Sequence, residues 1–185
     1  VVRINSQSGK GGVVHVLERD YGITLPRWLQ VEFAKVVQKD AEESGGEINA
    51  ARIHQLFNAH YLKTCPSWQM QSYDLQRTNE SVQGTFSLGA EAEGAVLVSG
   101  QGRGAVSALA NALSKLYGES ISVESFDEFS LGDNTDASAM ACVRVKVGER
   151  LHSAAALAQD TTSAALQAVL NVVGQLLGEL VGELI

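Results

Sequence analysis

The sequence predicts an α+β protein in which helices pack on β-sheet. Three observations carry this prediction: a helical hydrophobic period from residue 26 to about residue 61, short strand-like runs from residue 70 onward, and a βββα pattern that occurs twice. A chain of 185 residues is long enough for two small domains. We therefore expect a small α+β subdomain at residues 1–66, followed by a domain of two βββα units at residues 67–185.

The amino-terminal subdomain is predicted from its turn formers and its hydrophobic period. Two runs rich in valine, VVRI and VVHVLE, lie on either side of a Ser- and Gly-rich segment at residues 5–12, which predicts a β-hairpin. A helix is expected from Pro26 to the glycine pair at 45–46, and a second helix over residues 48–61. Residues 62–68 contain a proline and lose the period, so we interpret them as a linker.

The second domain is predicted as a repeat. Three strand candidates between residues 70 and 100 precede a helix that ends near residue 116, and three more between residues 121 and 158 precede a helix at 161–185. A shift of about 57 residues places the leucines of the first helix on those of the second. Neither unit is large enough to close a core alone. The second helix is the longer one, and we expect its apolar end, Leu176 to Ile185, to contact a partner subunit.

Charge and cysteine usage exclude several classes of protein. The net charge is −7 and no basic run occurs, so nucleic acid is not an expected partner. Cys65 and Cys142 lie far apart and outside any CxxC or Cys/His cluster, which is typical of reduced thiols in a cytoplasmic protein and predicts no metal site. Glycine and glutamate interrupt the longest apolar run, so no membrane span is expected. The start has neither Met nor a signal-peptide pattern, and we interpret the chain as a soluble piece of a longer one.

A ligand is predicted at the stretch AVLVSGQGRGAVSALANALSKL, residues 95–116, which is typical of a strand, a glycine-punctuated turn and an amphipathic helix. Gly100, Gly102 and Gly104 remove three side chains at the turn, so we expect the backbone to adopt positive φ there. The first N–H groups of the helix then point into open space. Because the helix dipole adds positive charge at the same place, a carboxylate or a phosphate is the expected occupant.

The opening RINSQSGKGGVVHVLERDYGITLPRWLQVEF, together with the later GQGRGAV, resembles the C-terminal part of 2-isopropylmalate synthase, an acyltransferase of leucine biosynthesis. The resemblance implies that residues 1–66 correspond to the linker subdomain that follows the family's catalytic barrel. It also implies that residues 67–185 correspond to the regulatory domain, which forms a homodimer and binds the feedback inhibitor leucine. No segment resembles the barrel, where acetyl-CoA, 2-oxoisovalerate and a divalent metal would bind. The fragment is therefore expected to hold no cofactor and to be inactive alone.

The resemblance also implies a leucine site. The loop near the carboxylate of the effector falls on Gly102, Arg103, Gly104, Ala105 and Val106. The opposite wall falls on Val123, Phe126, Ser130, Thr135, Ala137 and Thr161. The sequence departs from the family pattern in two places, where Arg103-Gly104-Ala105 replaces Asn-Gly-Pro and residues 126–129 replace an aromatic-acid-His run.

The sequence leaves several interpretations open. Arg103 either pairs with a carboxylate or lies in solvent, and Phe126 is a core residue if the resemblance is set aside. Gly100, Gly102 and Ala105 satisfy the G-x-G-x-x-A pattern of dinucleotide-binding domains, with Glu124 about twenty residues further on. However, no helix separates the strands after residue 124, as a doubly wound fold requires. A standalone amino-acid-binding module and the regulatory domain of citramalate synthase, which is regulated by isoleucine, are two more candidates.

Overall fold

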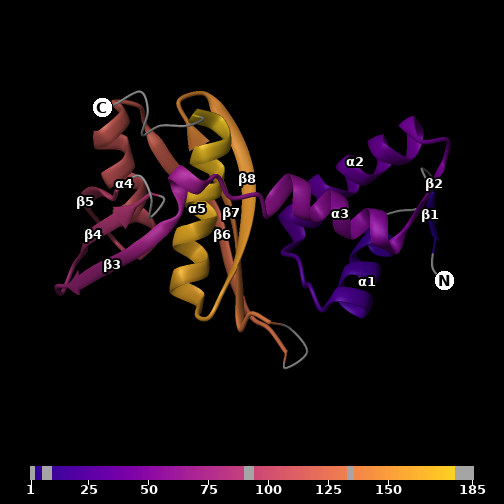
Figure 1. Ribbon diagram of the computed structural model, residues 1–185, viewed down its shortest axis with the longest axis horizontal. Helices are drawn as coiled ribbons and strands as arrows, with labels where there is room; N and C mark the ends of the chain where they lie inside the picture. The colour runs from indigo at the N-terminus through magenta and orange to yellow at the C-terminus, as the bar shows by residue number, and fades with distance from the viewer. Residues whose placement is uncertain (1–2, 6–9, 90–93, 133–135, 178–185) are drawn as a thin grey trace.

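The computed structural model describes residues 3–5, 10–89, 94–132 and 136–177. Two lobes follow one another along the longest axis of the molecule (Figure 1). The helical lobe contains three helices and one pair of short strands, up to residue 61. The sheet lobe, residues 66–177, contains two three-stranded sheets with two helices between them. The predicted α+β class is therefore confirmed.

The helical lobe is formed by α1 (Lys10–Tyr21), α2 (Arg27–Glu43), α3 (Ala50–Tyr61) and the antiparallel pair of β1 (Arg3–Asn5) with β2 (Glu47–Asn49). The predictions of α2 and α3 are confirmed. Helix α2 begins directly after a proline, and Gly45 and Gly46 follow its end with φ of +98° and +119°. Asn49 caps α3, because its side chain accepts a hydrogen bond from the Arg52 N–H at 2.9 Å.

The predicted hairpin at the start of the chain is wrong. The run VVHVLE lies in helix α1, and β1 pairs with β2 and not with residues 13–18. Val13, Val16 and Leu17 recur at helical spacing, and all three are buried in one cluster with residues of α2 and α3. Burial of this stripe outweighs the preference of valine for strands.

The sheet lobe repeats one unit twice, as predicted. Each unit is an antiparallel meander, whose strands pair in the order in which they follow one another, and then a helix. The first unit contains β3 (Met70–Arg77), β4 (Val82–Leu88), β5 (Val96–Gly102) and α4 (Ala105–Tyr117). The second contains β6 (Ile121–Ser130), β7 (Ala139–Val147), β8 (Arg150–Ala158) and α5 (Thr161–Leu177).

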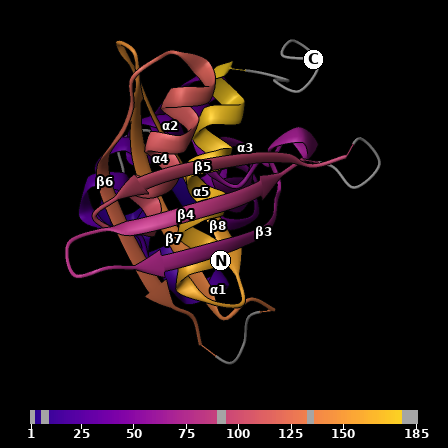
Figure 2. The same cartoon turned by 90° about the vertical axis from the view of Figure 1, so that its left-hand side faces the viewer.

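The two units share one core. Figure 2 shows β3, β4 and β5 lying across α4 and α5, and β6 to β8 lie on the other side of these helices. Leu109 and Leu113 of α4 belong to the same buried cluster as Leu166 and Leu170 of α5. The opposite face of the second sheet contributes Met140 and other residues to the core of the helical lobe. The second sheet is therefore covered on both faces, by different lobes.

The linker between the lobes is fixed along α5. Thr64 donates a hydrogen bond to the side-chain oxygen of Asn171 at 2.8 Å, and the Gln167 amide donates to the Trp68 carbonyl at 3.1 Å. Trp68 ends the 3₁₀ helix η1 (Pro66–Trp68) and is buried against Gly174. The segment predicted to contact a partner subunit lies mostly in residues 178–185, outside the described residues.

Candidate functional site

The predicted turn lies between the end of β5 at Gly102 and the start of α4 at Ala105, with Gly104 as the helix cap. The Gly104 N–H donates to the Ser107 hydroxyl at 3.1 Å, and that hydroxyl donates to the Gly104 carbonyl at 3.3 Å. The Asn111 amide donates to the Gln101 carbonyl at 2.6 Å. These side-chain contacts fix the turn on the first turns of the helix.

The expectation of positive φ at the three glycines is wrong. Gly100, Gly102 and Gly104 are not among the glycines with positive φ, and Gly104 is extended, with φ of −150°. Two of them are needed for close packing: a Cβ on Gly100 would lie 2.4 Å from the Ala108 carbonyl oxygen, and one on Gly102 would lie 2.6 Å from the Ser107 hydroxyl. Around Gly104 no atom lies within 4 Å of that position. Of the three, Gly104 therefore faces open space.

The amino end of α4 suits an anion. The first helical N–H groups have no acceptor within a helix, and the first turn of α4 contains no acidic residue. Helix α5 differs at the corresponding place. Its first residue is Thr161, and the carboxylate of Asp160 before it accepts hydrogen bonds from the Ser163 N–H at 2.8 Å and the Ser163 hydroxyl at 2.9 Å. The start of α5 is thus occupied by a carboxylate of the chain itself, whereas the start of α4 has only a glycine.

Strand β6 carries Val123 and Phe126, which were predicted as the wall opposite the turn. A bulge in the strand decides whether these two residues lie on the same face. Val123 pairs with Val145 and Phe126 pairs with Val143, with a register shift between Val123 and Ser125. In a regular strand two residues three apart point to opposite faces, but the extra residue of the bulge returns Phe126 to the face of Val123. Glu128 and Ser130 follow on that same face, which is the one toward α4 and α5.

The turn and the first half of the wall lie at the same level. The Ser114 hydroxyl of α4 accepts from the Ile121 N–H at 3.0 Å, which fixes the end of α4 to the start of β6. From Ser114 back to Ala105 the helix runs about 13 Å, and β6 covers the same length in about four residues. Phe126 is therefore level with the first turn of α4. Phe126 is 41% exposed, while Val106 and Val123 pack partly buried on the shared core.

The structure places the remaining predicted residues further away within one chain. Ser130 is exposed at the end of β6, about 20 Å along the strand from Val123. Thr161 begins α5, and Ala137 lines a separate groove between the lobes. Thr135 lies outside the described residues. Arg103 is exposed beside Gly104. The predicted set is thus divided into one group at the turn of α4 and another near the start of α5.

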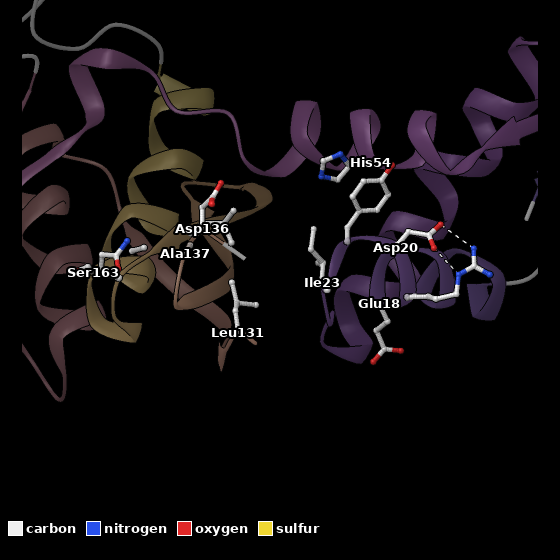
Figure 3. Close-up of a pocket in the computed structure, with 14 residues that line it drawn as sticks. Glu18, Asp20, Ile23, His54, Leu131, Asp136, Ala137 and Ser163 are labelled. Carbon is white, nitrogen blue, oxygen red and sulfur yellow. Dashed lines mark hydrogen bonds and ion pairs between the residues drawn. The ribbon is translucent and has the colours of Figure 1, made fainter. Parts of the chain in front are cut away.

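The groove between the lobes was not predicted from the sequence. It has a volume of about 1080 Å³, and Figure 3 shows Leu131, Asp136 and Ala137 on one side and Ile23 and His54 on the other. The His54 ring is stacked on a tyrosine ring of α1 with 3.8 Å between the centroids, and burial lowers the pKa of His54. The walls of the groove come from both lobes, so no local sequence motif indicates the groove.

The described part of the chain has neither a metal-ligand cluster nor a membrane-spanning helix. In residues 3–5, 10–89, 94–132 and 136–177, no three His, Cys, Asp or Glu side chains are arranged to hold a metal ion. None of the helices in these ranges is both long enough and apolar enough to cross a membrane.

Comparison with known proteins identifies the family. Residues 47–177 match the family model of the LeuA allosteric (dimerisation) domain. The chain is 61% identical over 171 residues to the 2-isopropylmalate synthase of Alcanivorax borkumensis. It is 37% identical over 176 residues to that of Rhodospirillum rubrum, and 37% identical over 172 residues to that of Thermobifida fusca.

These alignments cover 92%, 92% and 91% of the chain, but only 31%, 31% and 29% of the relatives. The chain therefore spans about three tenths of the length of the curated relatives it matches. The family match begins at β2 and extends over both βββα units. Because it covers more than half of the chain and includes the turn of α4 and the wall of β6, the chain belongs to the LeuA allosteric (dimerisation) domain family.

Proposed function

We propose that this chain is the regulatory part of a 2-isopropylmalate synthase and that leucine is its allosteric effector. The observation that carries the proposal is that the open amino end of α4 lies level with Val123 and Phe126 of β6. The chain also belongs to a family of allosteric domains. The condensation of acetyl-CoA with 2-oxoisovalerate, and the divalent metal it uses, belong to a catalytic barrel outside this chain. We place the whole enzyme in the cytoplasm, as the two free cysteines of this chain favour.

The chemistry of leucine matches the groups at this place. Its carboxylate accepts hydrogen bonds from the first N–H groups of α4, where the absence of a side chain at Gly104 leaves room. Its isobutyl group lies toward Val106, Val123 and Phe126. Its ammonium group needs an anionic acceptor, and the exposed carboxylate of Glu128 lies on the same face of β6. The family's usual Asn-Gly-Pro is absent here, and the exposed Arg103 offers a second partner for the carboxylate.

Calorimetry of the chain with leucine, isoleucine, valine, glycine and NAD tests this function. Leucine is expected to bind. The dissociation constant of valine is expected to be at least about tenfold higher, because one methylene in an apolar pocket contributes about 1–3 kcal/mol. Glycine is expected to give almost no heat. Gly104→Val is expected to abolish binding and to leave the fold mostly intact, since a side chain there has open space and only the weaker helix cap lowers the melting temperature. Heat with NAD and none with any branched amino acid would favour a dinucleotide-binding domain instead, and isoleucine binding more tightly than leucine would favour citramalate synthase.

We also propose that the chain forms a homodimer through residues 67–185, as the name of its family indicates. A stable interface of this kind buries more than ~1,000 Å² in total. Light scattering is expected to give twice the chain mass of 19.7 kDa. A particle of 19.7 kDa at high micromolar concentration contradicts the proposal.

A further inference from the structure

Strand β6 presents alternate residues to the two lobes. Phe126 and Glu128 lie on the face toward α4 and α5. Asp127 pairs with Cys142 and Phe129 pairs with Met140, and both partners belong to the core of the helical lobe. Neighbouring residues of one strand therefore form the wall of the proposed effector site and the surface on which α2 packs.

Asp127 is directly bonded to the helical lobe. The indole Nε1–H of Trp28, in the first turn of α2, donates to the Asp127 carboxylate at 2.7 Å. Both side chains are partly buried, and the acceptor is charged, so this hydrogen bond is of the stronger kind. It joins residues 99 positions apart in the sequence.

The other two strands of the sheet hold the start of α2. The Arg144 guanidinium of β7 lies 4.9 Å from the centroid of the Trp28 ring and forms an ion pair with Glu32 at 3.2 Å. The Ser153 hydroxyl of β8, which is 2% exposed, donates to the same Glu32 carboxylate at 2.8 Å. Because Arg144 and Ser153 anchor α2 to β7 and β8, the Trp28 contact reports movement of the edge strand β6 relative to them.

We propose that β6 transmits effector binding to the helical lobe, and that the Trp28–Asp127 hydrogen bond is the contact through which it does so. This inference rests on the proposed function, because it requires an effector beside Phe126. A ligand that displaces β6 at Phe126 displaces the next residue, Asp127, and changes its bond to α2. Coupling of this kind is reciprocal: a contact whose strength depends on the effector also changes the affinity for the effector when it is removed.

The experiment measures leucine affinity by calorimetry in the whole chain and in variants outside the proposed site. Trp28→Phe removes the donor and keeps an aromatic ring, and Asp127→Ala removes the acceptor. Each is expected to change the leucine dissociation constant by about fivefold or more, and the double variant by no more than either single one. Glu119→Ala is the matched control, because it removes an exposed carboxylate two residues before β6 that bonds no residue of α2 among the hydrogen bonds of the described residues. It is expected to keep the wild-type affinity.

A second readout follows α2 itself. Leucine is expected to change amide hydrogen exchange in residues 27–43 of the wild type and of Glu119→Ala, but not of Trp28→Phe or Asp127→Ala. If leucine binds and the four proteins have the same affinity and the same exchange in α2, the inference is wrong and the proposed function stands. If leucine does not bind to the wild type, both are overturned.

Discussion

The packing of α4 on β5 gives the sharpest prediction about the fold. In Gly100→Ala the new Cβ would lie 2.4 Å from the Ala108 carbonyl oxygen and 2.5 Å from the Ala112 nitrogen. These are backbone atoms four residues apart in α4, so no flexible side chain can give way. Ordinary contacts begin at 3.4 Å. The helix must therefore move away from the strand by about 1 Å, the difference between these distances, which is a backbone shift of the kind that overpacking causes.

The expected cost is about 2 kcal/mol. Overpacking of this kind costs about 1–3 kcal/mol, and the lower backbone entropy of alanine in the unfolded chain recovers about 0.5 kcal/mol. For a chain of this size, that cost lowers the melting temperature by about 4–8 °C. The control is Gly104→Ser, which adds a Cβ where no atom lies within 4 Å and places a favoured residue at the helix cap.

Thermal unfolding followed by circular dichroism, at one fixed protein concentration, checks this prediction, because dimerisation makes the melting temperature depend on concentration. Gly104→Ser is expected to melt within about 2 °C of the wild type. A Gly100→Ala variant as stable as the wild type would show that Gly100 does not set the distance between α4 and β5. Close packing would then not be the reason for a glycine at this position.

Three further predictions concern buried and partly buried side chains. Burial and the nearby Asp127 charge raise the pKa of Cys142 to about 12. A thiol reagent is therefore expected to modify the half-buried Cys65 first and Cys142 only on unfolding. Equal modification rates of the two cysteines in the folded chain would contradict this prediction. Burial lowers the pKa of His54 below 6.5, so folding favours its neutral form and the free energy of unfolding falls as the pH drops below 6.5. In denaturant titrations, the free energy of unfolding of His54→Gln is expected to fall less between neutral and acidic pH than that of the wild type. If it falls by the same amount, His54 is not the cause of the pH dependence. Asn171→Leu leaves the Ala155 carbonyl without its 2.9 Å donor and is expected to cost about 1–3 kcal/mol in the same assay, whereas a neutral effect would mean that water replaces the amide.

Much of the fold could be predicted because the signals are local. Helices α2 and α3 follow a hydrophobic stripe with clear ends, and the two βββα units repeat one pattern of strands and turns. Helix α1 was missed because its stripe is made of valines, whose strand preference is outweighed only by burial against α2 and α3. That burial depends on residues far away in the sequence.

The arrangement of the candidate site could be predicted only in part, for the same reason. The anion-suited end of α4 follows from a strand, a glycine turn and a helix, all within one stretch. The resemblance named Val123 and Phe126, but their period alone places them on opposite faces, and only the bulge of β6 brings them together. The Trp28–Asp127 contact and the groove between the lobes join distant segments, and no local pattern indicates either.

The covering of the second sheet on both faces has a consequence for how the chain folds. Its strands pair with sequence neighbours, whereas α2 is held by contacts that span 99 to 121 residues. Closing a loop of that length costs about 4 kcal/mol of chain entropy, so we expect the meander to form first and the helical lobe to dock on it later. Until docking, the face of the sheet that carries Met140, Cys142 and Ala155 is in contact with water. A sheet lobe produced without residues 1–61 would keep this apolar face uncovered and is expected to self-associate through it during expression.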